Sequence, residues 1–223
     1  MIQTHFASLS HDMKTPLSAI ALYNDRIRSM KLDDPERHAC HEVIADQIDR
    51  LVHITRSVLE HNGPSVGDDY VDLTALLLDT VSIYEKLHPE YTFVLLASEE
   101  LPLIRGDGPA LGRVLTNLLD NAIAYSQPTQ IVIAAELQSE GLQLRVRDRG
   151  CGIPVQTLPH VFKPHFRGNS TVPGSGMGLA IVQDIIHAHG GRIEIASTAG
   201  VGTVIRIILP KNLFIKTNHE LYI

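Results

Sequence analysis

An apolar side chain recurs about every third or fourth residue through the first thirty positions, and this repeat constrains the fold more than any other feature. Polar residues lie between these positions, which is typical of one long amphipathic helix. Asp34 followed by Pro35 indicates a second helix, because aspartate caps a helix and proline suits its first position. Asn62-Gly63-Pro64 closes that second helix. The apolar positions of the first helix are Phe6, Leu9, Met13, Leu17, Ile20, Ile27 and Met30.

Two helices alone bury too little apolar surface to cover both of their apolar stripes. We therefore expect this helical hairpin to pair with a second copy of the chain in a dimeric four-helix bundle. Residues 62–70 are rich in Gly, Pro, Ser and Asp, which predicts a linker and a domain boundary near residue 65.

Beyond the linker, predicted helices and strands alternate, and several strands form hairpin-like pairs. This order favours an α+β sandwich, in which helices cover one face of a sheet. We predict domains at 1–65 and 66–213, followed by a tail at 214–223 of unknown role. The predicted helices are 73–84, 109–125 and 179–189, and the predicted strands are 91–96, one near 103, 130–137, 142–146, 192–196 and 203–209.

The bulk properties exclude some classes of function. A net charge of -6 and a pI near 6.0 argue against a general nucleic-acid binder, which normally carries a basic stripe. No apolar run is long enough for a membrane helix, and no signal peptide is visible at Met1. The two cysteines form neither a disulfide framework nor a metal cluster, so we expect a cytoplasmic setting.

His11 is the first residue with a chemical prediction. On a helix it points away from the stripe of Leu9 and Met13, so we expect an exposed imidazole. A neutral imidazole nitrogen is a good nucleophile towards phosphorus, and Asp12 could hold the proton on the other nitrogen. Most surface histidines have no such role, but Thr15 lies on the same face and Pro16 bends the helix at a cost.

Asn117 and Asn121 lie one turn apart on the predicted helix at 109–125, so both face one site. An amide oxygen is a hard ligand that suits Mg²⁺, which takes few protein ligands besides nucleotide phosphates. Taken alone, the pair could equally be two ordinary surface amides.

Two glycine-rich segments follow. At Asp148 a strand ends and the chain turns through Gly150 and Gly152, so the backbone can approach a flat ligand while the carboxylate accepts a hydrogen bond from an exocyclic amine. A plain turn is the alternative. The segment 174–178 opens the last helix, whose free N–H groups suit triphosphate oxygens. Residues 155–173 between the two segments predict either a lid or a disordered surface loop.

Together these residues resemble the sensor histidine kinases of two-component signalling, from Phe6 to Pro210. The family's boxes occur in order. They are the phosphoacceptor box at His11–Pro16, the N box at Asn117–Asn121, the first glycine box at Asp148–Gly152, the F box at Phe162–Phe166 and the second glycine box at Gly174–Gly178.

The resemblance implies a dimerisation and phosphotransfer hairpin joined to an ATP-binding domain of the fold shared with gyrase, Hsp90 and MutL. It implies that His11 is phosphorylated, that Asp12 is its base or orienting partner, and that Thr15 positions water for dephosphorylation. It makes Asn121 the Mg²⁺ ligand and Asp148 the reader of adenine. The remaining nucleotide-binding positions are Asn117, Tyr125, Gly150, Gly152, Ile153, Phe166, Arg167, Gly174, Gly176, Met177, Gly178 and Leu179.

Two positions depart from related patterns. The hydrolytic relatives carry a glutamate where this chain has Asn117, and without that base transfer to an imidazole is favoured over hydrolysis. Many family members carry a basic residue where this chain has Ala124, so we expect Arg167, Lys163 or Arg113 to supply charge to the phosphate.

The resemblance implies ATP and Mg²⁺ as cofactors, a homodimer, and the receiver domain of a response regulator as partner, with no nucleic acid. It implies a cytoplasmic location, with membrane attachment only through a sensor region outside this chain. Two alternatives stay open. One is a nucleotide-binding dimeric scaffold or phosphatase-dominant partner, and the other is a mechanical ATPase clamp.

Overall fold

The computed structural model describes residues 2–31, 36–37, 39–41, 43–44, 47–48, 51, 69–98, 101–168, 172 and 176–215, with side chains from residue 13 onwards. The chain divides into two compact units. One unit holds Met1–Pro64 and Asn169–Met177, and the other holds Ser65–Gly168 and Gly178–Ile223. Each unit is described by itself.

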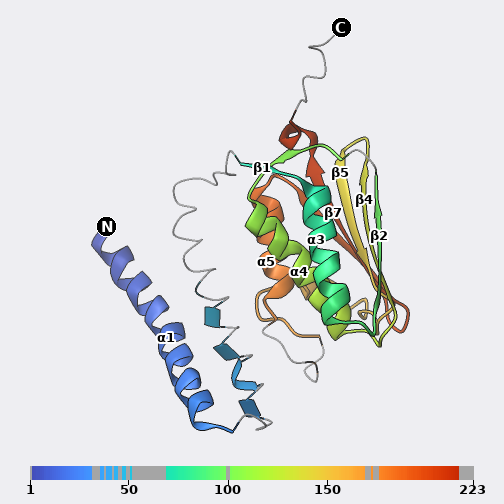
Figure 1. Cartoon of the computed structure of the whole chain (residues 1–223). Helices are drawn as coiled ribbons and strands as arrows, with labels where there is room; N and C mark the ends of the chain where they lie inside the picture. The colour runs from blue at the N-terminus through green and yellow to red at the C-terminus, as the bar shows by residue number, and fades with distance from the viewer. Residues whose placement is uncertain are drawn as a thin grey trace. The chain divides into compact units, whose positions relative to one another are not determined.

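The N-terminal unit is helical. Helix α1 spans Ile2–Ser29 and contains Pro16, as the apolar repeat predicts (Figure 1). The described residues between 36 and 51 are helical as well. Arg26 on α1 forms an ion pair of 2.6 Å with Glu36, and Ile27 and Cys40 are buried. The rest of the second predicted helix and the linker lie outside the described residues, and the dimer stays a prediction.

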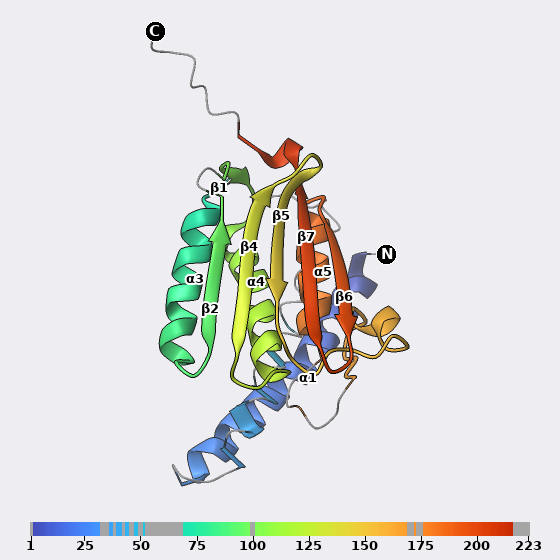
Figure 2. The ribbon, with the colours of Figure 1, turned by 90° about the vertical axis from the view of Figure 1, so that its right-hand side faces the viewer.

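The second unit is the predicted α+β fold. Its larger sheet has five strands, in the order β2 (Thr92–Ala97), β4 (Gln130–Leu137), β5 (Gly141–Arg147), β7 (Gly202–Pro210) and β6 (Arg192–Thr198) (Figure 2). The β2–β4 pair is parallel and the other neighbours are antiparallel. Helices α3 (Leu73–Leu87), α4 (Gly108–Ala124) and α5 (Gly178–Ala188) cover one face. Alternating apolar residues of the strands fill the core beneath them.

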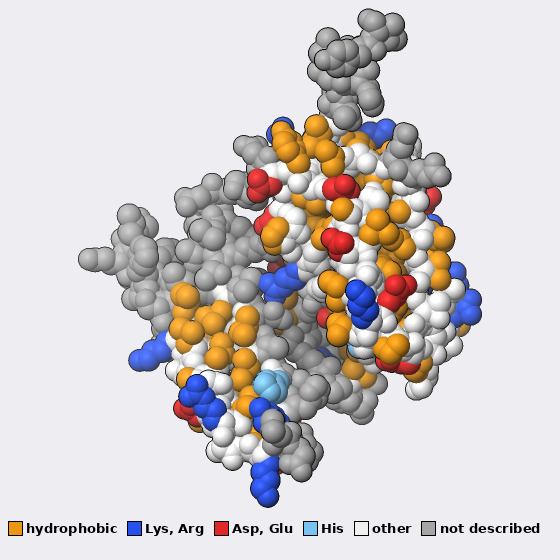
Figure 3. Space-filling model, in the orientation of Figure 1, with side chains coloured by type: hydrophobic (Ala, Val, Ile, Leu, Met, Phe, Trp, Pro, Cys, Tyr) orange, Lys and Arg blue, Asp and Glu red, His pale blue; other side chains and the backbone are white. Residues whose placement is uncertain are grey.

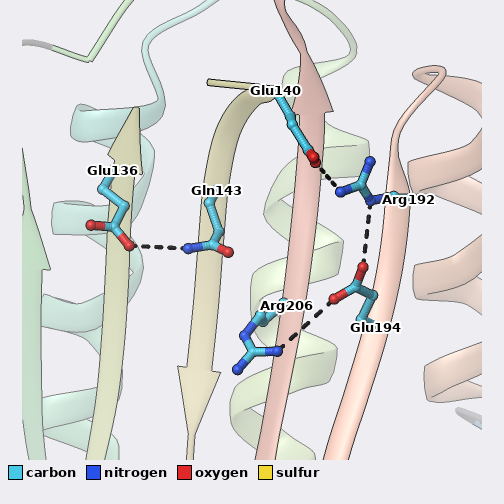
Figure 4. A network of polar contacts seen from close by, with 6 residues as sticks. All are labelled: Glu136, Glu140, Gln143, Arg192, Glu194 and Arg206. Carbon is cyan, nitrogen blue, oxygen red and sulfur yellow. Dashed lines mark hydrogen bonds and ion pairs between the residues drawn. The ribbon is translucent and has the colours of Figure 1, made fainter. Parts of the chain in front are cut away.

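The other face of the sheet carries charged and polar side chains on β4 to β7, as alternation along antiparallel strands allows. A network of contacts runs across four of its strands and the turn after β4, and its members are Glu136, Gln143, Glu140, Arg192, Glu194 and Arg206 (Figure 4). The charged side chains among these are each more than a third exposed, so each ion pair contributes little to stability.

Apolar and acidic side chains are interspersed over the face of this unit seen in Figure 3. On α3, Leu78, Ile83 and Leu87 are each more than half exposed. None of the helices in the described part of the chain has the length and apolar character needed to cross a membrane.

Helix α4 is fixed along its length by side chains from other elements. Asp107 caps its start, and the backbone N–H of Asp107 donates to Nε2 of the buried His189 at 3.1 Å. The Tyr84 hydroxyl on α3 donates to Asp120 Oδ1 at 2.6 Å. The Tyr91 hydroxyl lies 3.1 Å from the Ile123 carbonyl oxygen near the end of α4. These contacts hold in place the helix that carries both asparagines.

Short pairings occur at both edges of this domain. Tyr70, assigned to the linker, belongs to β1 (Tyr70–Val71), which pairs with β3 (Ile104–Arg105). Phe214 forms a bridge to Ile104, and the Ile215 N–H donates to the Leu103 carbonyl at 3.0 Å, so the fold continues beyond residue 213. Both pairings join segments far apart in the sequence, which local patterns do not reveal.

Candidate functional site

Three predicted site residues are aligned along α4. Asn117, Asn121 and the C-cap residue Tyr125 follow one another at intervals of one turn, so they share a face of the helix. From Asn117 to Tyr125 the helix rises by about 12 Å, which is long enough to lie along a nucleotide. The first glycine loop and the start of α5 meet this face at opposite ends.

The two asparagines carry donors that the protein leaves unused. The Nδ2 atoms of Asn117 and Asn121 are buried and have no hydrogen-bond partner among the described residues. A buried amide without a partner costs stability, so such a group requires an explanation. Two neighbouring unsatisfied donors fit a ligand that brings acceptor oxygens.

The start of α5 lies beside these amides. A Cβ atom placed on Gly178 would lie 3.3 Å from Asn117 Oδ1 and 3.6 Å from Asn121 Nδ2. The first turn of a helix has backbone N–H groups without intrahelical partners and carries partial positive charge. The asparagines and the α5 N-terminus therefore form one donor-rich, anion-attracting end of the site.

Asp148 marks the other end, directly after β5. Its Oδ1 accepts hydrogen bonds from the backbone N–H groups of Gly150 at 2.8 Å and Thr203 at 3.1 Å. Its Oδ2 accepts no hydrogen bond from the described residues, so it is available to a ligand donor. Burial raises the pKa of the Asp148 carboxyl above its ordinary value, and the backbone hydrogen bonds offset this effect in part.

The glycines after Asp148 are required by close backbone packing. A Cβ on Gly150 would collide with the carbonyl of Tyr125, which also accepts a hydrogen bond of 2.9 Å from the Cys151 N–H. Gly152 has φ of 64° and packs against the carbonyl of Thr198. The sequence analysis assigns these glycines to the approach of the backbone to a ligand. The structure shows that they seat the loop on α4 and on the β6–β7 turn.

The loop after Ile153 supplies the remaining described positions. The Phe166 ring lies 5.8 Å from the ring of His160, and Arg167 next to it is exposed. Gly176 has φ of 70°, and Met177, Gly178 and Leu179 lead into α5. Gly174 and most of the predicted lid beyond residue 168 lie outside the described residues. Charge compensation by Arg167, Lys163 or Arg113 stays a prediction.

The proposed phosphoacceptor segment lies on α1, in the other unit. The side chains of His11 and Asp12 lie outside the described residues, so the predicted exposure of His11 stays untested. Thr15 on the same helix is exposed. Asn117, Asn121, Asp148 and the start of α5 therefore belong to one unit, and the candidate acceptor helix belongs to the other.

Sequence reasoning missed two residues beside Asp148. Thr203 on β7 donates its backbone N–H to the carboxylate, and its hydroxyl lies 2.9 Å from Ser197 Oγ on β6. No local pattern marks either residue, because their importance comes from pairing between strands that are remote from Asp148 in the sequence.

Comparison with protein families agrees with this division. Residues 106–213 match the family described as histidine kinase-, DNA gyrase B- and HSP90-like ATPase. Residues 1–61 match the His Kinase A (phospho-acceptor) domain.

Individual sensor histidine kinases are similar to this chain over most of its length. The sensor histidine kinase ZraS of Escherichia coli K12 is 31% identical over 93% of this chain and 45% of its own length. YvrG of Bacillus subtilis, also a sensor histidine kinase, is 28% identical over 92% of this chain and 38% of its own length. The chain thus spans less than half the length of these relatives.

Solved structures share the fold. The mycobacterial sensor histidine kinase MprB superposes with a TM-score of 0.59 at 31% identity, covering 64% of this chain and 97% of that one. Full-length ShkA in complex with AMPPNP gives a TM-score of 0.63 at 24% identity, covering 93% of this chain and 45% of that one. The likeness to ShkA concerns the fold alone.

Proposed function

We propose that this chain, which belongs to the sensor histidine kinases of two-component signalling, transfers the γ-phosphoryl group of ATP to His11 and then to an aspartate of a response regulator. The observation that carries the proposal is the pair of buried, unsatisfied amides of Asn117 and Asn121 beside the α5 N-terminus. They supply donors for a triphosphate on a domain of the ATPase family.

Asp148 and the two amides bind different parts of ATP. The free Oδ2 of Asp148 accepts a hydrogen bond from the adenine amino group, which identifies the base. The Nδ2 atoms of Asn117 and Asn121 and the first N–H groups of α5 donate to phosphate oxygens. Tyr125, whose carbonyl seats the loop after Asp148, lies at the adenine end and borders the nucleoside.

The same residues fit Mg²⁺. Once its nitrogen donates to phosphate, Asn121 still has its amide oxygen, a hard ligand of the kind that Mg²⁺ accepts alongside phosphates and water. When bound, the ion supplies neutralisation of charge on the phosphates. Asn121 would thus contribute a ligand to the ion and a donor to the nucleotide.

In the transfer step a ring nitrogen of His11 attacks the γ-phosphorus. The new N–P bond forms as the bond to the bridging oxygen breaks, and ADP leaves with the electron pair of that bond. Asp12 holds the proton on the other ring nitrogen and keeps the attacking nitrogen unprotonated. Positioning and electrostatics supply most of the rate of such transfers. In the phosphatase activity, Thr15 positions the water that dephosphorylates the regulator.

We further propose that the chain works as a homodimer through its helical hairpin, and that the regulator docks near Thr15. Because the curated relatives are more than twice as long, we propose that the chain is the cytoplasmic portion of a larger membrane-bound sensor. These partners follow from the family.

The alternatives differ in what they do with ATP. Asn117 stands where the hydrolytic relatives carry a catalytic glutamate, which disfavours a mechanical ATPase clamp.

In the test that separates the kinase, the scaffold and the clamp, wild-type chain is incubated with ATP labelled at either the α- or the γ-phosphate. Acid-labile, alkali-stable protein label from the γ-position alone supports the kinase. Nucleotide binding without label supports the scaffold, and steady phosphate release without label supports the clamp.

Asn121→Ala is expected to weaken Mg²⁺-ATP binding by about tenfold, because a hydrogen bond to a charged group and a metal ligand are lost together. Titration with a fluorescent ATP analogue, with and without Mg²⁺, measures the effect. The loss should be larger with Mg²⁺ present. Gln183→Ala on α5 provides a control amide deletion outside the site. Equal affinities of Asn121→Ala and wild type would remove Asn121 from the site.

A further inference from the structure

Ser197 lies near the end of β6, and its hydroxyl contacts the end of the loop that carries Asp148 and the start of β7. Its Oγ lies 2.8 Å from the Ile153 backbone nitrogen, 2.9 Å from the Gly202 carbonyl oxygen and 2.9 Å from Thr203 Oγ1. The residue is half-buried. Its three contacts come from the end of the Asp148 loop and from the start of β7, segments about fifty residues apart.

The number of protons fixes the direction of each hydrogen bond. A serine hydroxyl has one proton and two lone pairs. Its proton is donated to the Gly202 carbonyl oxygen, so the two lone pairs accept from the Ile153 N–H and from the Thr203 hydroxyl. The hydrogen-bonding capacity of Ser197 is therefore fully used within the protein, and the side chain has a single favourable arrangement.

The contact with Thr203 connects Ser197 to the carboxylate. The Thr203 N–H donates to Asp148 Oδ1 at 3.1 Å, and the Asp148 N–H donates to the Thr203 carbonyl at 3.0 Å. Gly202 packs so closely against the Asp148 carbonyl that a Cβ at this position would collide with it. Ser197 thus holds the β7 residues that orient Oδ1, and at the same time holds Ile153, five residues after Asp148.

From this geometry we infer that Ser197 is a positioning residue for base recognition: it aims the free Oδ2 of Asp148 at the amino group of adenine. The inference rests on the proposed function, because it requires ATP as the nucleotide. It makes a specific claim about selectivity. Loss of the hydroxyl should weaken binding of a purine nucleotide that has the amino group, and should spare one that lacks it.

The test compares ATP with inosine triphosphate, which has a carbonyl in place of the adenine amino group. Ser197→Ala in the full chain is expected to weaken ATP binding by about fivefold, the scale of one hydrogen bond, and to change inosine triphosphate binding by less than about twofold. Ser197→Thr keeps the hydroxyl, so this variant should keep the wild-type preference for ATP. Thr198→Ala, which removes an exposed hydroxyl from the next position on β6, is the matched control and should bind like wild type.

Equal weakening of both nucleotides, or of neither, by Ser197→Ala would overturn the inference. Thermal unfolding checks that each variant folds. If Ser197→Ala unfolds early, Ser197→Cys keeps the side-chain volume with weaker hydrogen bonds, and the same comparison applies to it. Asp148→Asn separates the two hypotheses. If Asp148→Asn also leaves the preference for ATP unchanged, the proposal that Asp148 recognises the base is wrong. If Asp148→Asn abolishes the preference and Ser197→Ala does not, only the inferred role of Ser197 is wrong.

Discussion

His11→Gln is expected to abolish labelling of the chain by γ-labelled ATP, while the chain still binds ATP. Glutamine retains a polar side chain of similar reach on α1, but its amide nitrogen is a poor nucleophile towards phosphorus. Asn117, Asn121 and Asp148 belong to the other unit of the chain, so their structure should not depend on this substitution. Gel autoradiography measures the label, and a fluorescent ATP analogue measures binding.

His41→Gln is the matched control, since His41 is an exposed histidine among the described helical residues that follow α1. It should be labelled as strongly as wild type. Label that persists in His11→Gln would place the phosphoryl group on another residue and remove the assigned acceptor.

Asp148→Asn is expected to weaken ATP binding by about 100-fold, because a charge-assisted hydrogen bond is lost and a donor replaces the acceptor. The asparagine oxygen can still accept from the Gly150 and Thr203 N–H groups, so the loop keeps its internal contacts. The amide nitrogen then takes the place of Oδ2 and opposes the adenine amino group. Calorimetric titration with ATP measures the loss, and Asp184→Asn on the exposed side of α5 is a matched control.

The same substitution should not destabilise the unliganded protein. Burial raises the pKa of Asp148 in the fold, so the folded state takes up the proton before the unfolded state as the pH falls. The ionised carboxylate therefore costs stability above the folded-state pKa, and this cost is relieved towards acidic pH. At neutral pH, Asp148→Asn should melt at or above the wild-type temperature. A clear decrease would show that Asp148 serves the fold rather than the ligand.

Local patterns predicted the elements of the fold because each element has its own period. The apolar repeat around Leu17 indicated α1, and alternation through Ile131 and Ile133 indicated β4. The type of side chain also marked Asp148, Asn117 and Asn121 as candidates, because a carboxylate and paired amides suit a nucleotide and Mg²⁺, and their roles stay predictions.

Long-range contacts were not predictable in the same way. The hydroxyl of Ser197 and the backbone of Thr203 act on Asp148 only because β6 and β7 pair and lie beside β5. The burial of His189, which directly follows α5, against the cap of α4 likewise joins residues 82 positions apart in the sequence. Gly150 was recognised, but its purpose depends on the Tyr125 carbonyl, whose position only the fold sets.

The most direct test of the central claim is to locate the phosphoryl group. Wild-type chain is incubated with Mg²⁺ and ATP, digested at neutral to alkaline pH to preserve phosphohistidine, and its peptides are sequenced by mass spectrometry. We expect one phosphoryl group on His11, absent when ADP replaces ATP. Phosphorylation at another residue, or ATP consumption with His11 unmodified, would contradict the account.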